Sequence, residues 1–240
     1  MARIFITGSA DGLGQLAAKE LIAKGHQVVL HARNTVRAEH VFSKIPEAGK
    51  VLIADLSDTE ETKGLAEEVN ALGTFDAIIH NAGVYHASSR VILSVNTLAP
   101  YLLTCLIRKP KRLIYLSSGL HSSGDPNPYK MEKGHVSYSD SKLHDLILAK
   151  AVARKWPEVF SNAVNPGWVP TKMGGAGAPD DLQKGVETQV WLAVGEDAMV
   201  SGRYYFHKKE ARYFSEADQV SLQDQFLEEC GRITGVRFPG

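Results

Sequence analysis

Short runs of β-branched and apolar residues alternate along the chain with longer segments in which apolar residues recur every three or four positions. The short runs predict strands and the longer segments predict amphipathic helices. In residues 12–24, for example, Leu13, Leu16 and Leu21 fall on one face, and Gly25 follows as a stop signal. By the same reading, strands are expected at residues 3–7, 27–32, 51–54, 75–80, 112–117, 159–165 and 203–206, and further helices at residues 35–44, 58–72, 92–107, 137–155, 180–194 and 221–233.

This alternation indicates one fold class. Parallel strands joined by helices form right-handed crossovers, which place helices on both faces of the sheet. We therefore expect a doubly wound α/β fold with a seven-stranded, mostly parallel sheet. No repeat, low-complexity segment or linker interrupts the pattern, so residues 1–240 are expected to form a single domain. A ligand should bind at the carboxyl ends of the strands, where the strand order reverses between the first and fourth strands.

Composition excludes several classes of protein. Lys plus Arg and Asp plus Glu are both 27, and this zero net charge argues against a dedicated nucleic-acid binder. The 240 residues, 44% of them apolar, are enough for a core without disulfide or metal staples. Cys105 and Cys230 form no CxxC motif, and the histidines show no metal-binding spacing. The chain is therefore expected in the reducing cytoplasm, without a structural metal.

No membrane association is expected. The most apolar stretch, residues 91–107, is interrupted by Asn96 and Pro100 and is expected to be too short to span a bilayer. Strand-like sequence begins at Arg3, so we expect no signal peptide.

The first predicted strand runs directly into a glycine-rich turn, TGSADGLG at residues 7–14. Gly8, Gly12 and Gly14 lack a Cβ, which allows the backbone to approach a pyrophosphate closely. The helix that follows directs its N–H groups and positive dipole end toward the anion. A plain strand–turn–helix connection is the alternative, but the strand before and the helix after favour a phosphate-binding turn.

The spacing Gly-x-x-x-Gly-x-Gly resembles that of the short-chain dehydrogenase/reductase family, single-domain branch. Four further stretches match in order: NAG at residues 81–83, SVN ending at Asn96, YSDSK at residues 138–142 and NPGWVPT at residues 165–171. The resemblance covers essentially the whole chain and implies a Rossmann-type fold that binds NAD(P). It also implies hydride transfer between a nicotinamide and a carbonyl carbon. The loop at residues 121–136 is similar to that of retinol-dehydrogenase-like members.

Such chemistry needs a group that gives a proton to the carbonyl oxygen. The pKa of a free tyrosine is about 10, and a cation about 6 Å away, one helical turn along, lowers it. This is the physical basis of Tyr-x-x-x-Lys. The sequence contains four such pairs: Tyr129/Lys133, Tyr138/Lys142, Tyr204/Lys208 and Tyr205/Lys209.

Predicted secondary structure separates these pairs. Tyr129 lies in a proline-containing loop, where no stable helix is expected. Tyr204 and Tyr205 lie in a predicted strand, where four residues span about 13 Å. Only Tyr138 opens a long helix with an apolar face. We therefore expect Tyr138 to act as general acid and base, with Lys142 lowering the Tyr138 pKa and, as the resemblance implies, holding the nicotinamide ribose.

The resemblance implies two more catalytic residues. Ser118, after the fifth strand, matches the serine that orients and polarises the carbonyl. Asn96 matches the helix asparagine that positions a water beside the lysine, although a polar residue at a kink near Pro100 is the alternative. Side chains expected to form pocket walls, or else to pack ordinarily, are Tyr85, His121, Tyr129, Trp168 and Met173.

The end of the second strand bears on the choice between the two nicotinamide cofactors. An NAD site usually has an acid here that binds the ribose 2′-hydroxyl, whereas this sequence has Ala32 followed by Arg33. A guanidinium suits a 2′-phosphate, so we expect NADP(H) in preference to NAD(H). A solvated arginine is the alternative for Arg33, and Asp11 in the glycine turn could repel the same phosphate.

Other cofactor contacts follow from the resemblance. Asp55 matches a residue that hydrogen-bonds the adenine amino group, with a helix N-cap as the alternative. Asn81 matches one that stabilises the sheet and touches adenosine. Val169 and Thr171 would bond the carboxamide or a phosphate. The expected cofactor-binding set is Gly8, Ser9, Gly12, Leu13, Gly14, Arg33, Asn34, Asp55, Leu56, Asn81, Ala82, Gly83, Tyr138, Lys142, Pro166, Gly167, Val169 and Thr171.

We therefore predict an NADP(H)-dependent oxidoreductase that interconverts a small-molecule carbonyl and an alcohol. A catalytically silent NAD(P)-sensing regulator is the alternative, and the Tyr138–Lys142 pair argues against it, because such sensors usually lack that pair. A sugar-nucleotide epimerase is disfavoured by the glycine spacing and by the missing C-terminal domain. Many relatives pair through the helices carrying Asn96 and Tyr138, so a homodimer or homotetramer is possible, although some are monomers.

Overall fold

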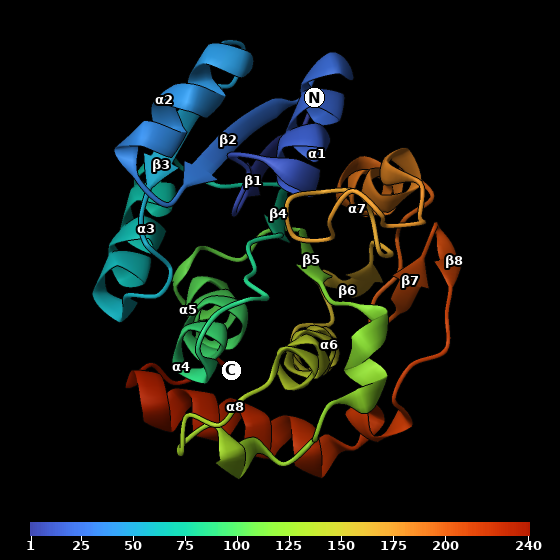
Figure 1. Ribbon diagram of the computed structural model, residues 1–240. Helices are drawn as coiled ribbons and strands as arrows, with labels where there is room; N and C mark the ends of the chain where they lie inside the picture. Colours follow the sequence, from blue (N-terminus) through green and yellow to red (C-terminus); the bar gives the residue numbers. More distant parts are fainter.

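The computed structural model describes all 240 residues, and its strands form one sheet in the order β3-β2-β1-β4-β5-β6-β7-β8, with helices on both faces (Figure 1). The expected doubly wound α/β class is confirmed. The strands are β1 (Arg3–Ile6), β2 (Gln27–Ala32), β3 (Lys50–Ile53), β4 (Ala77–His80), β5 (Arg112–Leu116), β6 (Phe160–Asn165), β7 (Tyr204–Phe206) and β8 (Lys209–Glu210). The helices are α1 (Gly12–Ala23), α2 (Thr35–Lys44), α3 (Thr59–Ala71), α4 (Ser89–Ile92), α5 (Ala99–Leu106), α6 (Tyr138–Lys155), α7 (Leu182–Val194) and α8 (Val220–Thr234).

The expected count of seven strands is wrong by one short edge strand. β8 pairs antiparallel with β7, and the turn between them places His207 and Lys208 at φ values of 49° and 61°. β8 has only two residues, both exposed and charged. Such a segment shows no alternation of apolar and polar positions, so the pattern could not reveal it.

The central strands are buried because both faces of the sheet are covered. Ile4 and Ile6 of β1 belong to one hydrophobic cluster, together with residues of α1, α2 and α7. Phe5 points to the other face, into a larger cluster built with α3, α5, α6 and α8. β1 pairs in parallel with both β2 and β4. The crossovers from β1 therefore diverge at this point, and the carboxyl ends of β1 and β4 border a crevice between them.

The segment expected as one helix at residues 92–107 consists of α4, a π-helical turn at Leu93–Leu98, and α5. The expectation that this stretch is too short for a membrane is wrong by length, because Ser89–Leu106 forms 18 helical residues with a mean hydropathy of 1.2. Of this helix, 67% is buried inside the protein. Packing in the core therefore accounts for its apolar composition.

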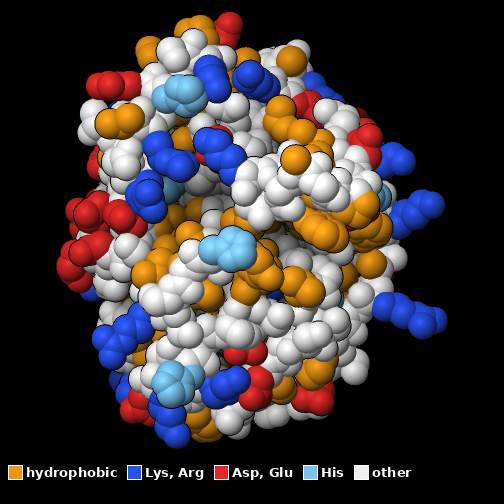
Figure 2. Space-filling view, viewed as in Figure 1, with side chains coloured by type: hydrophobic (Ala, Val, Ile, Leu, Met, Phe, Trp, Pro, Cys, Tyr) orange, Lys and Arg blue, Asp and Glu red, His pale blue; other side chains and the backbone are white.

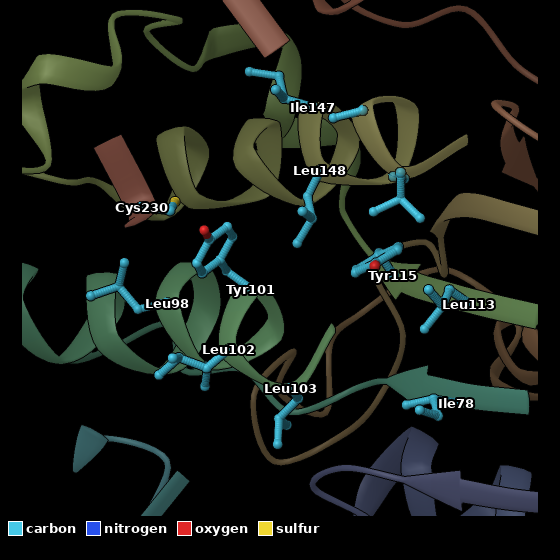
Figure 3. Packing of buried hydrophobic residues seen from close by; sticks show 14 of the residues in the cluster. Ile78, Leu98, Tyr101, Leu102, Leu103, Leu113, Tyr115, Ile147, Leu148 and Cys230 are labelled. Carbon is cyan, nitrogen blue, oxygen red and sulfur yellow. The ribbon is translucent and has the colours of Figure 1, made fainter. Parts of the chain in front are cut away.

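The C-terminal segment covers the outer side of α5 and α6. Phe226 and Cys230 of α8 are buried in the same cluster as both helices, and Figure 3 shows Cys230 beside Tyr101 of α5. The Tyr101 hydroxyl donates to the Val236 carbonyl at 2.7 Å, and the Trp156 indole N–H donates to the Pro239 carbonyl at 3.1 Å. Self-pairing through α5 and α6 would therefore require this segment to move.

Candidate active site

A cleft of about 370 Å³ opens at the carboxyl ends of the central strands. Figure 2 shows Lys and Arg side chains gathered beside a hollow on this face of the molecule. The cleft brings together most of the residues expected from the sequence to bind the cofactor. Those that line it are Gly8, Gly12, Leu13, Arg33, Asp55, Leu56, Asn81, Ala82, Gly83, Tyr138, Lys142, Pro166 and Thr171.

The glycine turn forms one wall of the cleft and leaves a helix end free. Gly8 and Gly12 have φ values of 62° and 57°, which L side chains rarely adopt. A Cβ on Gly8 would lie 2.7 Å from the Cα of Ala82. Asp11 occupies the N-cap position of α1 but makes no side-chain cap hydrogen bond. The first N–H groups of α1 therefore keep no side-chain acceptor, which fits a pyrophosphate at this end of the helix.

Asn81 and Gly14 hold the turn against the sheet. The Asn81 side-chain amide donates to the carbonyls of Thr7 and Gly8 at 2.9 and 3.0 Å. Gly14 does not line the cleft; a Cβ there would lie 2.4 Å from the Asn81 amide nitrogen. Ser9 is likewise buried, and its hydroxyl accepts from the backbone N–H of His31 at 2.8 Å. Gly14 and Ser9 therefore shape the turn from behind.

His31 of β2 supports the same turn, and the sequence analysis missed it. Its Nδ1 accepts from the backbone N–H of Gly8 at 2.9 Å, so its Nε2 carries the proton and donates to the Ala54 carbonyl at 3.0 Å. Burial lowers the pKa of His31 to about 4, which keeps the ring neutral. A lone histidine inside a strand carries no motif, so no sequence signal marked it.

Tyr138 and Lys142 meet in the cleft at the start of α6. A capping box of Ser137 and Asp140 fixes the first turn of this helix. The Lys142 Nζ lies 5.7 Å from the centroid of the Tyr138 ring. Burial lowers the pKa of Lys142, but Asp145 and Tyr138 outweigh it and raise that pKa above its ordinary value. Lys142 is therefore a permanent ammonium beside the phenol.

The other Tyr-x-x-x-Lys pairs lie elsewhere, as expected. Tyr129 sits in a 3₁₀ turn and is 58% exposed. Tyr204 and Tyr205 are buried in β7. None of these three tyrosines lines the cleft.

Ser118 follows β5 but is not among the residues that line the cleft. Its hydroxyl accepts from the backbone N–H of Leu120 at 3.2 Å and donates to no protein group. Its carbonyl accepts from His121 Nδ1 at 2.6 Å and from the Tyr204 hydroxyl at 3.1 Å. The neighbouring Ser117 does line the cleft, but its hydroxyl is already committed to the Lys142 carbonyl at 2.6 Å. Of the two serines, only Ser118 keeps a hydroxyl proton to donate.

Asn96 is fully buried in the π-helical turn and serves as a clamp. Its Oδ1 accepts from the Val84 N–H at 2.8 Å, and its Nδ2 donates to the Val84 carbonyl at 2.9 Å and to the Ser141 hydroxyl at 3.0 Å. The side chain thus ties the segment after β4 to α6. Both of its N–H groups are used in this way, so they are not available to a water beside Lys142.

Basic side chains gather at the end of the cleft near β2. Arg33, Arg37 and Lys172 all line it. From the sequence, Asp11 was expected to repel a 2′-phosphate. In the structure it pairs with Arg37 at 3.4 Å and with Lys172 at 3.0 Å. Two cations therefore offset its charge, and Arg33 has no acidic partner within ion-pair distance.

Asp55 lines the cleft, and the N-cap alternative for it is wrong because Asp58 caps α3. One Asp55 carboxylate oxygen accepts from the N–H and hydroxyl of Ser57 at 2.9 and 2.7 Å. Burial acts to raise the pKa of Asp55, but the two Ser57 hydrogen bonds and the charge of Arg33 lower it below its ordinary value. Asp55 is therefore an anionic acceptor on this wall.

The remaining expected residues lie behind or beside the cleft. Asn34 caps α2 by accepting from the Arg37 N–H at 3.0 Å, Val169 is buried, and Gly167 has a φ of 86°. Of the expected pocket walls, Met173 lines the cleft. Tyr85 packs edge-on against Tyr138 with ring centroids 4.7 Å apart, His121 is buried, and Trp168 is 60% exposed.

Known proteins resemble this chain in sequence and in fold. A family model described as short chain dehydrogenase matches residues 2–104. The "Short-chain dehydrogenase chyC" of Penicillium rubens is 44% identical, with 100% of both chains covered. Among solved structures, an uncharacterised protein from Mycobacterium paratuberculosis gives a TM-score of 0.82 at 21% identity, covering 100% of this chain and 96% of that one. A blue fluorescent protein from a metagenomic library, in complex with NADPH, gives 0.71 at 18% identity, covering 85% and 94%.

Proposed function

Because this chain belongs to the short-chain dehydrogenase family, we propose that it is an NADP(H)-dependent oxidoreductase that reduces a small-molecule carbonyl to an alcohol, with Tyr138 as the proton donor. One observation carries the proposal. A phenol and a permanent ammonium lie 5.7 Å apart, measured from nitrogen to ring centroid. They line the same cleft as the glycine turn at the start of α1.

NADPH supplies a hydride to the carbonyl carbon when it is bound. Tyr138 gives its phenol proton to the carbonyl oxygen, which gains negative charge in the same step. The Lys142 ammonium stabilises the phenolate that remains, because an opposite charge nearby favours the ionised form. The free hydroxyl proton of Ser118 is suited to hold the same oxygen, although this requires the hydroxyl to turn toward the cleft. In alcohol oxidation the Tyr138 phenolate takes the proton back.

Three features support NADP(H) in preference to NAD(H). Ala32 stands where an NAD site usually has an acid. Arg33 lines the adjacent wall, and Arg37 and Lys172 lie close by. Asp11, the acid in the glycine turn, is already paired with Arg37 and Lys172. The structural neighbour that was solved in complex with NADPH supports the same choice.

The test is the consumption of NADPH and of NADH with a panel of aldehydes, ketones and quinones. We expect turnover with at least one carbonyl class and a clear preference for NADPH. A protein that binds NADPH tightly but turns over no member of the panel would support the silent sensor instead. A preference for NADH would refute the cofactor assignment and leave the oxidoreductase assignment standing.

A further inference from the structure

A buried aspartate holds the lysine of the candidate active site. Asp145 lies one turn after Lys142 on α6, and its Oδ2 accepts from the Lys142 Nζ at 2.7 Å. The two side chains are only 4% and 6% exposed. Lys142 donates also to the Leu116 carbonyl at 2.7 Å, whereas Lys142 is the sole hydrogen-bond partner of the Asp145 carboxylate. No motif in the sequence pointed to this residue.

The groups packed around this pair are neutral. Tyr115 of β5 lies within electrostatic range of Asp145, and burial raises its pKa above the ordinary range. His80 of β4 stacks on Tyr115, with ring centroids 4.8 Å apart, and burial lowers its pKa to about 3. Burial also raises the pKa of Cys105, on α5, to about 12 and lowers that of His144, on α6, to about 4. No further charge therefore balances or screens the pair.

The contact with Lys142 favours the ionised form of the Asp145 carboxylate. Burial raises the pKa of Asp145 to about 6, and the Lys142 ammonium limits that rise. Above that value the pair is an ammonium and a carboxylate in contact. The phenol of Tyr138 then faces an ion pair in place of an isolated positive charge. Because the field of an ion pair falls off faster with distance than that of a single charge, Lys142 stabilises the Tyr138 phenolate less than it would alone.

We propose that Asp145 is a positioning residue that fixes Lys142 in the cleft and offsets its charge, and that this offset sets the pH range over which the site works. This inference rests on the proposed function, because it assigns a role to Asp145 in the proton transfer of Tyr138. It concerns the pH range of the reaction and leaves the equilibrium between carbonyl and alcohol unchanged.

The test is the pH profile of kcat/KM for alcohol oxidation with NADP⁺ in Asp145→Asn. Asparagine keeps the shape and an oxygen acceptor for Lys142, and it removes the charge. Removing one negative charge at a separation of one to two helical turns should move the apparent pKa of the profile about one pH unit lower. The basic limb of carbonyl reduction should move in the same direction.

Asp218→Asn is a matched control. Asp218 pairs at 2.7 Å with Lys150, which lies on α6 like Lys142. The Lys150 side chain is as buried as that of Lys142. This second lysine–aspartate pair lies outside the cleft. Its loss should affect stability and leave the pH profile in place.

A profile of Asp145→Asn that superimposes on that of the native enzyme would overturn the inference. If this variant fails to fold, ¹³C-labelled aspartate carboxyls can be titrated by NMR in the native protein. We expect one outlying titration near pH 6 that is complete by pH 8, since every other aspartate with a perturbed pKa is shifted downward. A buried carboxyl still protonated at pH 8 would overturn the inference as well. Failure of the proposed function would look different, because the native enzyme itself would show no turnover.

Discussion

Replacing His31 by alanine should lower the stability of the protein and its affinity for NADPH. The imidazole joins the Gly8 N–H and the Ala54 carbonyl through bonds of 2.9 and 3.0 Å, and His31 is 3% exposed. Alanine leaves the buried Ala54 carbonyl and the part-buried Gly8 N–H without partners. Each costs about 1–3 kcal/mol, so we expect a total near 3 kcal/mol. That is a large part of the ~5–15 kcal/mol that holds a typical domain folded.

The assay is urea unfolding of native, His31→Ala and His31→Gln proteins at pH 7.5, followed by circular dichroism. Glutamine is the control because it offers both a donor and an acceptor, and it should recover part of the loss. Since Gly8 also lines the cleft, the alanine variant should bind NADPH about tenfold more weakly, measured by cofactor fluorescence. A His31→Ala protein with native stability and native NADPH affinity would refute the reasoning.

Three further perturbations have expected outcomes. Burial lowers the pKa of His80 to about 3 and that of His144 to about 4. As the pH falls, the unfolded chain takes up protons at these histidines before the folded protein does, so the free energy of unfolding should be full above pH 6.5 and fall as the pH drops toward 4. Equal urea midpoints at pH 7 and pH 5 would contradict this. Gly8→Ala puts a Cβ 2.7 Å from the Cα of Ala82 and should abolish measurable NADPH binding, so native affinity by fluorescence titration would argue against the phosphate turn. Arg33→Ala should raise the KM for NADPH about 10- to 100-fold, because one charge-assisted hydrogen bond is lost, and should leave the KM for NADH unchanged. An equal rise for both cofactors would rule out a role of Arg33 in binding the 2′-phosphate.

The features that sequence could predict are those with a local chemical signature. The turn at Gly8 and Gly12 needs residues that tolerate positive φ, and Tyr138 and Lys142 need helical spacing, so both could be found from short stretches of sequence. The α/β class followed from periodicity, because burial on both faces of a sheet produces continuous apolar runs. The neighbouring strands and helices were located for the same reason.

The features that sequence could not predict depend on contacts between distant segments or on very short ones. Asp11 and Lys172 are 161 positions apart, and their pairing changes the meaning of an acid in the glycine turn. His31 is read as an ordinary strand residue until the fold places Gly8 above it. Asp145 is one turn from Lys142, but only the burial of both side chains makes it a partner. The π-helical turn and β8 are too short to alter a periodic pattern.

Turnover by Tyr138→Phe, measured beside its affinity for NADPH, tests the central claim most directly. Phenylalanine keeps the ring and removes the proton donor, so kcat for carbonyl reduction should fall about 10²- to 10⁴-fold while the NADPH dissociation constant stays within about twofold. Tyr129→Phe is the matched control, since Tyr129 belongs to another Tyr-x-x-x-Lys pair outside the cleft, and it should turn over at the native rate. A Tyr138→Phe enzyme that reduces carbonyls as fast as the native protein would contradict the account.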